Sequence, residues 1–151
     1  MTHRIIIDSN LLALLVVGTA GRSYITSHKR LAAYTAEDYD LLVGILGNAS
    51  AVWVTPHVLA ETSNLIGYTK EPARTKIYET LRKLTPALEE RQIRSSLSME
   101  RPEFVRLGLT DCTMLDVNAD STVLLTADLD LYLAASASGQ EARNFHHLRN
   151  L

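Results

Sequence analysis

Four carboxylates are placed where they could act together, although they are far apart in the chain. Asp8 directly follows the apolar run Ile5–Ile7, and Asp128 comes two residues after the run TVLLT. Glu61 and Asp111 each lie early in a segment with a helical pattern. Carboxylates that converge cannot all stay ionised without compensation, and hard divalent cations such as Mg²⁺ or Mn²⁺ bind oxygen ligands. The pattern therefore predicts a site in which these four acids bind Mg²⁺ or Mn²⁺ as a cofactor.

Each of the four acids also has a structural explanation when it is taken alone. Asp8 precedes a leucine-rich helical stretch, which it could cap. Asp111 and Asp128 stand near expected helix starts, where the helix dipole favours negative charge. Glu61 could be a solvated helix residue. The metal hypothesis depends on all four acids lying near one end of a single sheet.

Two of the four acids, Asp8 and Glu61, have polar residues at spacings that could bring them to the same site. Asn10 is two residues after Asp8, and in an extended segment both side chains would point the same way. His57, Glu61 and Asn64 have the spacing i, i+4, i+7, which places them on one helix face. We expect Asn10 and Asn64 to support the site, and the role of His57 stays open.

The segment around Asp128 carries a hydroxyl and a second acid. Thr126 precedes Asp128 by two residues, and its hydroxyl could hold a carboxylate in place. Asp130 follows Asp128 by two residues and is a candidate fifth acid that acts through water. We expect Thr126 and Asp130 to be supporting residues, and either Asp128 or Asp130 could be the fourth acid.

Alternating strand and helix patterns position these residues. Apolar runs predict strands at Ile5–Ile7, Ala51–Thr55 and Thr122–Thr126, with weaker candidates at Ile93–Leu97 and Ala142–His147. Helical patterns lie at Leu11–Val17 (ending near Gly18 and Gly21), Ala36–Leu46, His57–Ile66, Pro72–Leu84, Pro102–Leu107, Thr110–Ala119 and Leu129–Ala137. This alternation predicts an α/β fold, with a central parallel sheet between layers of helices. In such sheets ligands bind at the carboxyl ends of the strands.

Length and composition favour one domain over residues 1–151, with 46% hydrophobic residues to build its core. The formal net charge of -2 gives no global basic field for nucleic acid. Cys112 is the only cysteine, so an intrachain disulfide and a thiolate zinc cluster are both excluded. Asp8, Ser9 and Asn10 divide the apolar N-terminal run into halves too short to cross a membrane. We therefore expect a cytoplasmic protein without a membrane partner.

Basic residues are concentrated between Lys70 and Arg106, where nine Lys and Arg face six Glu, a local excess of three. Such residues could contact RNA phosphates. The candidates are Arg74, Lys76, Arg82 and Lys83, followed by Arg91 and Arg94. A solvated helix face with ion pairs inside the helix is the competing interpretation.

The four acid-bearing motifs together resemble those of the PIN-domain ribonucleases, which include the VapC-type toxins. The motifs are IIIDSN, TPHVLAETSNL, LGLTDCTML and VLLTADLDLY, and the resemblance covers nearly the whole chain. It implies a single PIN-like domain, a three-layer α/β/α sandwich with an acidic pocket that binds Mg²⁺ or Mn²⁺ and cleaves RNA. Asp8, Glu61, Asp111 and Asp128 each fall on a family acid.

The expected function is therefore a divalent-metal-dependent ribonuclease. A bound cation would activate water and neutralise the charge that develops on the phosphate, so no histidine base is required. In-line attack is expected to leave a 5′-phosphate and a 3′-hydroxyl. The resemblance also implies a homodimer and a cognate antitoxin, as in a type II toxin-antitoxin pair. The alternatives are an RNA-processing nuclease and a catalytically weak PIN fold that binds RNA or protein.

Overall fold

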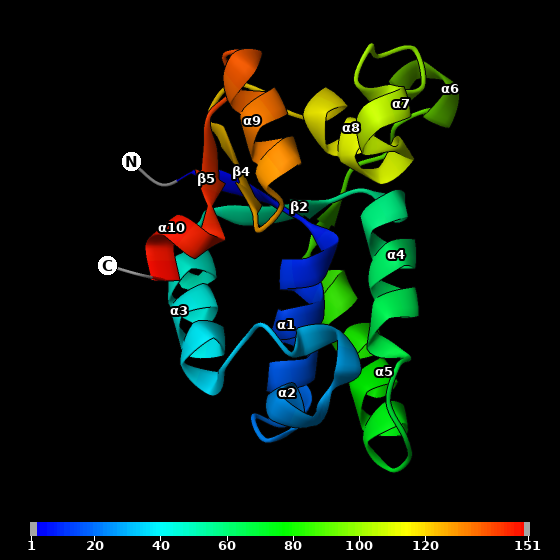
Figure 1. The fold of residues 1–151 in the computed structure, drawn as a ribbon, viewed down its shortest axis with the longest axis vertical. Helices are drawn as coiled ribbons and strands as arrows, with labels where there is room; N and C mark the ends of the chain where they lie inside the picture. The colour runs from blue at the N-terminus through cyan, green and yellow to red at the C-terminus, as the bar shows by residue number, and fades with distance from the viewer. Residues whose placement is uncertain (1–2, 150–151) are drawn as a thin grey trace.

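The computed structural model describes residues 3–149, and a parallel sheet forms its centre (Figure 1). Its five strands are β1 (Arg4–Ile7), β2 (Ala51–Val54), β3 (Glu89–Glu90), β4 (Thr122–Thr126) and β5 (Ala142–Asn144). They lie in the order β3-β2-β1-β4-β5, and every neighbouring pair is parallel. The expected α/β fold with a central parallel sheet is confirmed.

Helices cover both faces of the sheet, which gives a three-layer α/β/α sandwich. The helices are α1 (Ser9–Ala20), α2 (Tyr24–Ser27), α3 (Ala36–Gly47), α4 (Pro56–Ile66), α5 (Ala73–Leu84), α6 (Ser95–Ser98), α7 (Phe104–Leu107), α8 (Leu109–Asp116), α9 (Leu129–Ala137) and α10 (Phe145–Arg149), with 3-10 turns η1 (Lys29–Leu31) and η2 (Thr85–Ala87). Figure 1 shows α1 and α3 below the sheet and α9 above it. No helix within residues 3–149 is long and apolar enough to cross a membrane.

The central strands β1 and β4 are buried in the core, and the predicted site lies at their carboxyl ends. Ile6 pairs with Leu124 and Ile7 with Leu125, and all four are buried, as expected for strands covered on both faces. From β1 the sheet grows outward through β2 to β3 at one edge, and then through β4 to β5 at the opposite edge. Right-handed crossovers then place the connecting helices on opposite faces. The strand order thus reverses between β1 and β4, where such sheets bind ligands.

Two of the weaker strand predictions are wrong in whole or in part. Ile93–Leu97 is not a strand, because β3 is the short pair Glu89–Glu90 and the following segment turns into α6. Ala142–His147 is a strand only as far as Asn144. The Asn144 side chain accepts a hydrogen bond from the backbone N–H of His146 at 3.0 Å, and α10 starts at this point.

Helix α1 runs past Gly18, where the sequence suggested an end, and stops at Gly21. Gly18 faces α3, and a Cβ at this position would lie only 2.6 Å from Cε1 of Tyr39. The Tyr39 hydroxyl also lies 2.9 Å from the hydroxyl of Thr19. Gly18 is therefore needed for the close approach of the Tyr39 ring to α1.

A Gly18→Ala substitution is expected to destabilise the protein, because the new methyl group must displace the Tyr39 ring. Overpacking of this kind costs about 1–3 kcal/mol, and thermal unfolding should detect the loss. Gly44→Ala is the matched control, since it changes a helical glycine whose Cβ would meet no atom within 4 Å. The control should gain up to about 1 kcal/mol from helix propensity. Equal unfolding temperatures for the two variants would contradict the packing argument.

Candidate functional site

Asp8 joins the ends of the two central strands. It follows β1, caps α1 and is only 4% exposed. Its Oδ1 accepts a hydrogen bond from the N–H of Leu11 at 3.0 Å. Its Oδ2 accepts two more, from the Thr126 hydroxyl and from the N–H of Ala127 at 2.9 Å. The cap role is confirmed, and the same carboxylate is anchored at the point where the strand order reverses.

The pKa of the Asp8 carboxyl group is raised above its ordinary value. Burial raises the pKa of its carboxyl group, and the negative charge of Asp128 raises it further. The hydrogen bonds from Thr126, Leu11 and Ala127 act in the opposite direction but are weaker than the burial effect. Burial and the charge of Asp128 make ionisation of Asp8 unfavourable, and a bound cation would offset both effects.

Thr126 holds a carboxylate, but the carboxylate belongs to Asp8. Asp128 is the N-cap of α9, and its Oδ1 accepts from the N–H of Leu131 at 3.0 Å. Asp128 contacts Thr126 through its backbone, whose N–H donates a hydrogen bond to the Thr126 hydroxyl at 3.0 Å. Thr126 thus connects the turns that carry these two acids.

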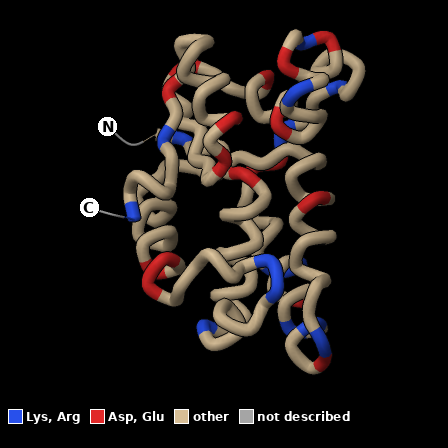
Figure 2. Tube along the Cα trace, viewed as in Figure 1, with Lys and Arg blue, Asp and Glu red and all other residues tan. Residues whose placement is uncertain are grey.

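Asp111 is the acid on which the others act together. It lies half-buried in the first turn of α8. Burial raises the pKa of its carboxyl group to about 7, with further contributions from the charges of Asp128, Asp8, Glu61 and Asp130. The structure therefore brings the other four predicted acids within electrostatic range of Asp111. Figure 2 shows red acidic segments in the centre of the molecule, around the start of α1.

The remaining predicted polar residues are placed differently. Glu61 and Asn64 are exposed on α4, as the helical spacing predicted. His57 Nε2 lies 2.8 Å from the Ser95 hydroxyl, so it contacts α6. Asn10 is exposed within α1. The expectation that Asn10 points with Asp8 along an extended segment is wrong, because the helix begins at residue 9.

The donor chemistry of this site fits a hard divalent cation. Glu61 and Asp111 offer carboxylate oxygens that accept no hydrogen bond within residues 3–149, and Asp128 is bonded through one oxygen only. Over the same residues, no three His, Cys, Asp or Glu side chains lie close enough to form a ready-made metal-binding group. A cation would therefore depend on one or two of these carboxylates, with water or phosphate oxygens completing its shell, as Mg²⁺ commonly does.

The predicted RNA-binding cations lie exposed on α5. Arg82 pairs with Glu79 at 3.0 Å, three residues away, as the competing interpretation of an intrahelical ion pair requires. Arg74 lies over the ring of Tyr78, 4.7 Å from its centroid. Arg91 lies over the buried ring of Trp53 at 3.9 Å. Nothing in the structure links Lys76 or Lys83 to the acids.

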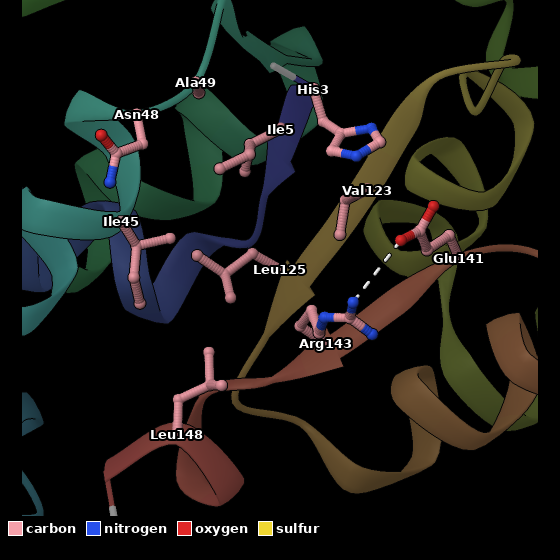
Figure 3. Close-up of a pocket in the computed structure, with 10 residues that line it drawn as sticks. All are labelled: His3, Ile5, Ile45, Asn48, Ala49, Val123, Leu125, Glu141, Arg143 and Leu148. Carbon is pink, nitrogen blue, oxygen red and sulfur yellow. Dashed lines mark ion pairs between the residues drawn. The ribbon is translucent and has the colours of Figure 1, made fainter. Parts of the chain in front are cut away.

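One cavity is lined by none of the predicted acids. It has a volume of about 440 Å³ on the sheet face beside α3 (Figure 3). Ile5 and Leu125 form part of its floor, with Ile45 and Leu148 on the side walls, and the ion pair between Glu141 and Arg143 at 3.6 Å is on its rim. It contains none of the predicted site residues, and sequence reasoning did not anticipate it.

Comparisons with known proteins add little to this geometry. No protein-family model matches the chain, and no curated protein matches it. Among solved structures, the chain is similar to one described as a domain of a functionally unknown protein from Methanocaldococcus jannaschii DSM 2661. The two are 20% identical with a TM-score of 0.45, over 95% of this chain and 91% of the other.

Proposed function

We propose that this protein is a divalent-metal-dependent ribonuclease that hydrolyses RNA phosphodiester bonds. The observation that carries the proposal is the gathering of Asp8, Glu61, Asp128 and Asp130 around the half-buried Asp111, with Asp8 hydrogen-bonded at the ends of both central strands; burial and these charges raise the pKa of Asp111 to about 7. Acids that repel one another in this way destabilise the fold unless a cation joins them. Asp8 follows β1 and Asp128 follows β4, so these carboxylates lie at the edge where parallel sheets bind ligands.

One or two of the carboxylates of Asp111, Glu61 and Asp128 would hold the cation, and Asp8 would anchor the site through its bonds to both strand ends. When bound, Mg²⁺ or Mn²⁺ supplies an activated water and neutralises charge on the phosphate. Asp8 is positioned by three hydrogen bonds, so its carboxylate stays fixed while substrate enters. Glu61 is exposed, so its side chain can move to meet a cation that binds the phosphate.

The proposal is tested by incubating the purified protein with labelled RNA in Mg²⁺ or Mn²⁺. Cleavage is expected with either metal, with products that carry a 5′-phosphate and a 3′-hydroxyl. EDTA should stop the reaction, and restored metal should restart it. Cleavage that continues undiminished in EDTA would contradict the proposal.

The biological setting belongs to the same proposal. We propose a cytoplasmic homodimer that acts as the toxin of a type II toxin-antitoxin pair, with an antitoxin that binds it directly. Induced expression should then arrest growth of a host cell, and co-expression of the product of the adjacent gene should relieve the arrest. A mass of one chain by light scattering would contradict the dimer.

A second candidate function is a PIN-fold module that binds RNA or protein without cutting. The observation that favours it is that the acids do not form a three-ligand group within residues 3–149. The two candidates differ in one result: the module would bind RNA in Mg²⁺ and Mn²⁺ and leave it intact.

A further inference from the structure

A second pocket lies at the far end of α4, where the chain turns into α5 (Figure 1). Its volume is about 370 Å³, and it is lined by Asn64, Gly67, Tyr68, Arg74 and Tyr78. Two aromatic rings, an amide and a guanidinium in one pocket are groups that proteins use to hold nucleotides in single-stranded nucleic acid. The pocket is therefore a candidate for RNA contact outside the acidic site.

Each tyrosine of this pocket has an arginine over its ring. The guanidinium carbon of Arg30, from η1, lies 4.2 Å from the centroid of Tyr68, and that of Arg74 lies 4.7 Å from the centroid of Tyr78. Tyr68 is 48% exposed, which is unusual for a ring that serves only to fill a core. Such stacking holds an arginine in place and leaves its planar N–H groups able to bind phosphate.

Both arginines retain their hydrogen-bonding capacity. Across residues 3–149, neither the Arg30 nor the Arg74 side chain donates a hydrogen bond or forms an ion pair. The nearby carboxylate of Glu71 is bound to the N–H and hydroxyl of Thr75. Hydrogen bonds from Thr75 lower the pKa of Glu71, and the charge of Arg74 lowers it further. Arg74 in the pocket and Arg30 over the ring of Tyr68 thus offer cationic donors to an anionic group.

Tyr78 is fixed in position by the end of α4. Its hydroxyl donates to the carbonyl of Ser63 at 2.7 Å. A Cβ at position 67 would lie 2.6 Å from the same hydroxyl oxygen, so glycine is needed for this approach. A ring held in this way is preorganised, and binding pays little additional conformational entropy to order it.

The pocket lies along the same helix as one of the acids. Glu61 and Asn64 are both exposed and three residues apart, so they share one face of α4. From Glu61 to Gly67 the helix rises about 9 Å, at 1.5 Å per residue. An RNA strand with one phosphate at the acids could follow this face and reach the pocket with a neighbouring nucleotide.

We propose that this pocket binds a nucleotide of single-stranded RNA that flanks the cleaved bond. Its base stacks on Tyr68, and its phosphate is bound by Arg30 and Arg74. This inference rests on the proposed ribonuclease function and adds a binding subsite to it. The competing explanation is that the two arginine–tyrosine pairs only pack the α4–α5 turn against η1.

The test measures binding of a short fluorescent single-stranded RNA by anisotropy in Mg²⁺, in an Asp111→Asn background that suppresses cleavage. Tyr68→Ala and Arg74→Ala should each raise Kd at least about 5-fold, since stacking on one base contributes about 1–3 kcal/mol. Tyr68→Phe keeps the ring and should bind within about twofold of the parent. Arg74→Ala should also reduce the slope of log Kd against log salt by about 1, the change expected when one phosphate contact is lost.

Arg22→Ala is the matched control, because it removes an exposed arginine that pairs only with Asp40, at 2.6 Å. It should leave Kd unchanged. If Tyr68→Ala lowers the unfolding temperature while Kd and the salt slope stay at the parent values, the pairs are packing and the inference is overturned. Cleavage by the wild-type chain is measured separately, so absence of cleavage would refute the ribonuclease proposal while the Kd values still decide the pocket.

Discussion

Replacing Asp111 with asparagine is expected to lower the rate of RNA cleavage about 10²- to 10³-fold, the usual loss when one group that stabilises developing charge is removed. Asp111 interacts with every other predicted acid of the site. Asparagine keeps the shape of the side chain and removes its charge, so the loss would report charge alone. Single-turnover cleavage in Mg²⁺ and in Mn²⁺ is the measurement.

The control for this prediction is Asp40→Asn, which neutralises an exposed acid on α3 that pairs with Arg22. It should cleave at the wild-type rate. Asp8→Asn should lose activity to a similar degree, but it also weakens the bonds from Thr126 and Ala127. Wild-type cleavage by the Asp111 variant would remove the basis for a metal site here.

The same Asp111→Asn variant is expected to be more stable than the wild type in EDTA above pH 7. The carboxyl pKa is about 7 in the folded chain and 3.8 for an ordinary, solvent-exposed aspartate, as in the unfolded chain. The folded state therefore holds this proton where the unfolded state has lost it, and wild-type stability falls as pH rises from about 4 to 7. Asparagine removes the penalty, which after allowance for solvent screening is about 1–3 kcal/mol.

Denaturant unfolding at several pH values between 5 and 8 checks this prediction. The stability advantage of the variant should grow with pH and level off above 7. Added Mg²⁺ or Mn²⁺ should reverse the order, because a cation that binds only the folded wild type stabilises it by mass action. A pH-independent difference, or equal stabilisation of both chains by metal, would contradict it.

The sequence predicted most of the sheet because its central strands are apolar throughout. Ile5–Ile7 and Thr122–Thr126 are buried on both faces and leave a clear pattern. The edge strand Glu89–Glu90 has two charged, exposed residues, so no apolar pattern could reveal it. The helix end expected near Gly18 and Gly21 falls at Gly21, and sequence alone does not show the ring of Tyr39 packed against Gly18.

The sequence could place Asp8, Asp111 and Asp128 because each follows a strand or opens a helix, and parallel topology brings such positions to one edge. Their partners were less predictable. Thr126 was expected to hold a nearby carboxylate, and its connection to Asp8 spans 118 residues. The ring of Tyr68 is covered by Arg30, which is 38 positions earlier in the chain. Contacts of this range arise from the folded chain and have no local signature.

The bonds from Asp8 to Thr126 and Ala127 have a consequence for protein synthesis. A ribosome makes the chain from its N-terminus, and the first hundred residues contain only two of the four main acids, Asp8 and Glu61. The central strand pair cannot form until Thr122–Thr126 has left the exit tunnel. A nascent chain would therefore have no assembled acidic site until Thr122–Thr126 has been made, and the proposed activity would begin only after that point.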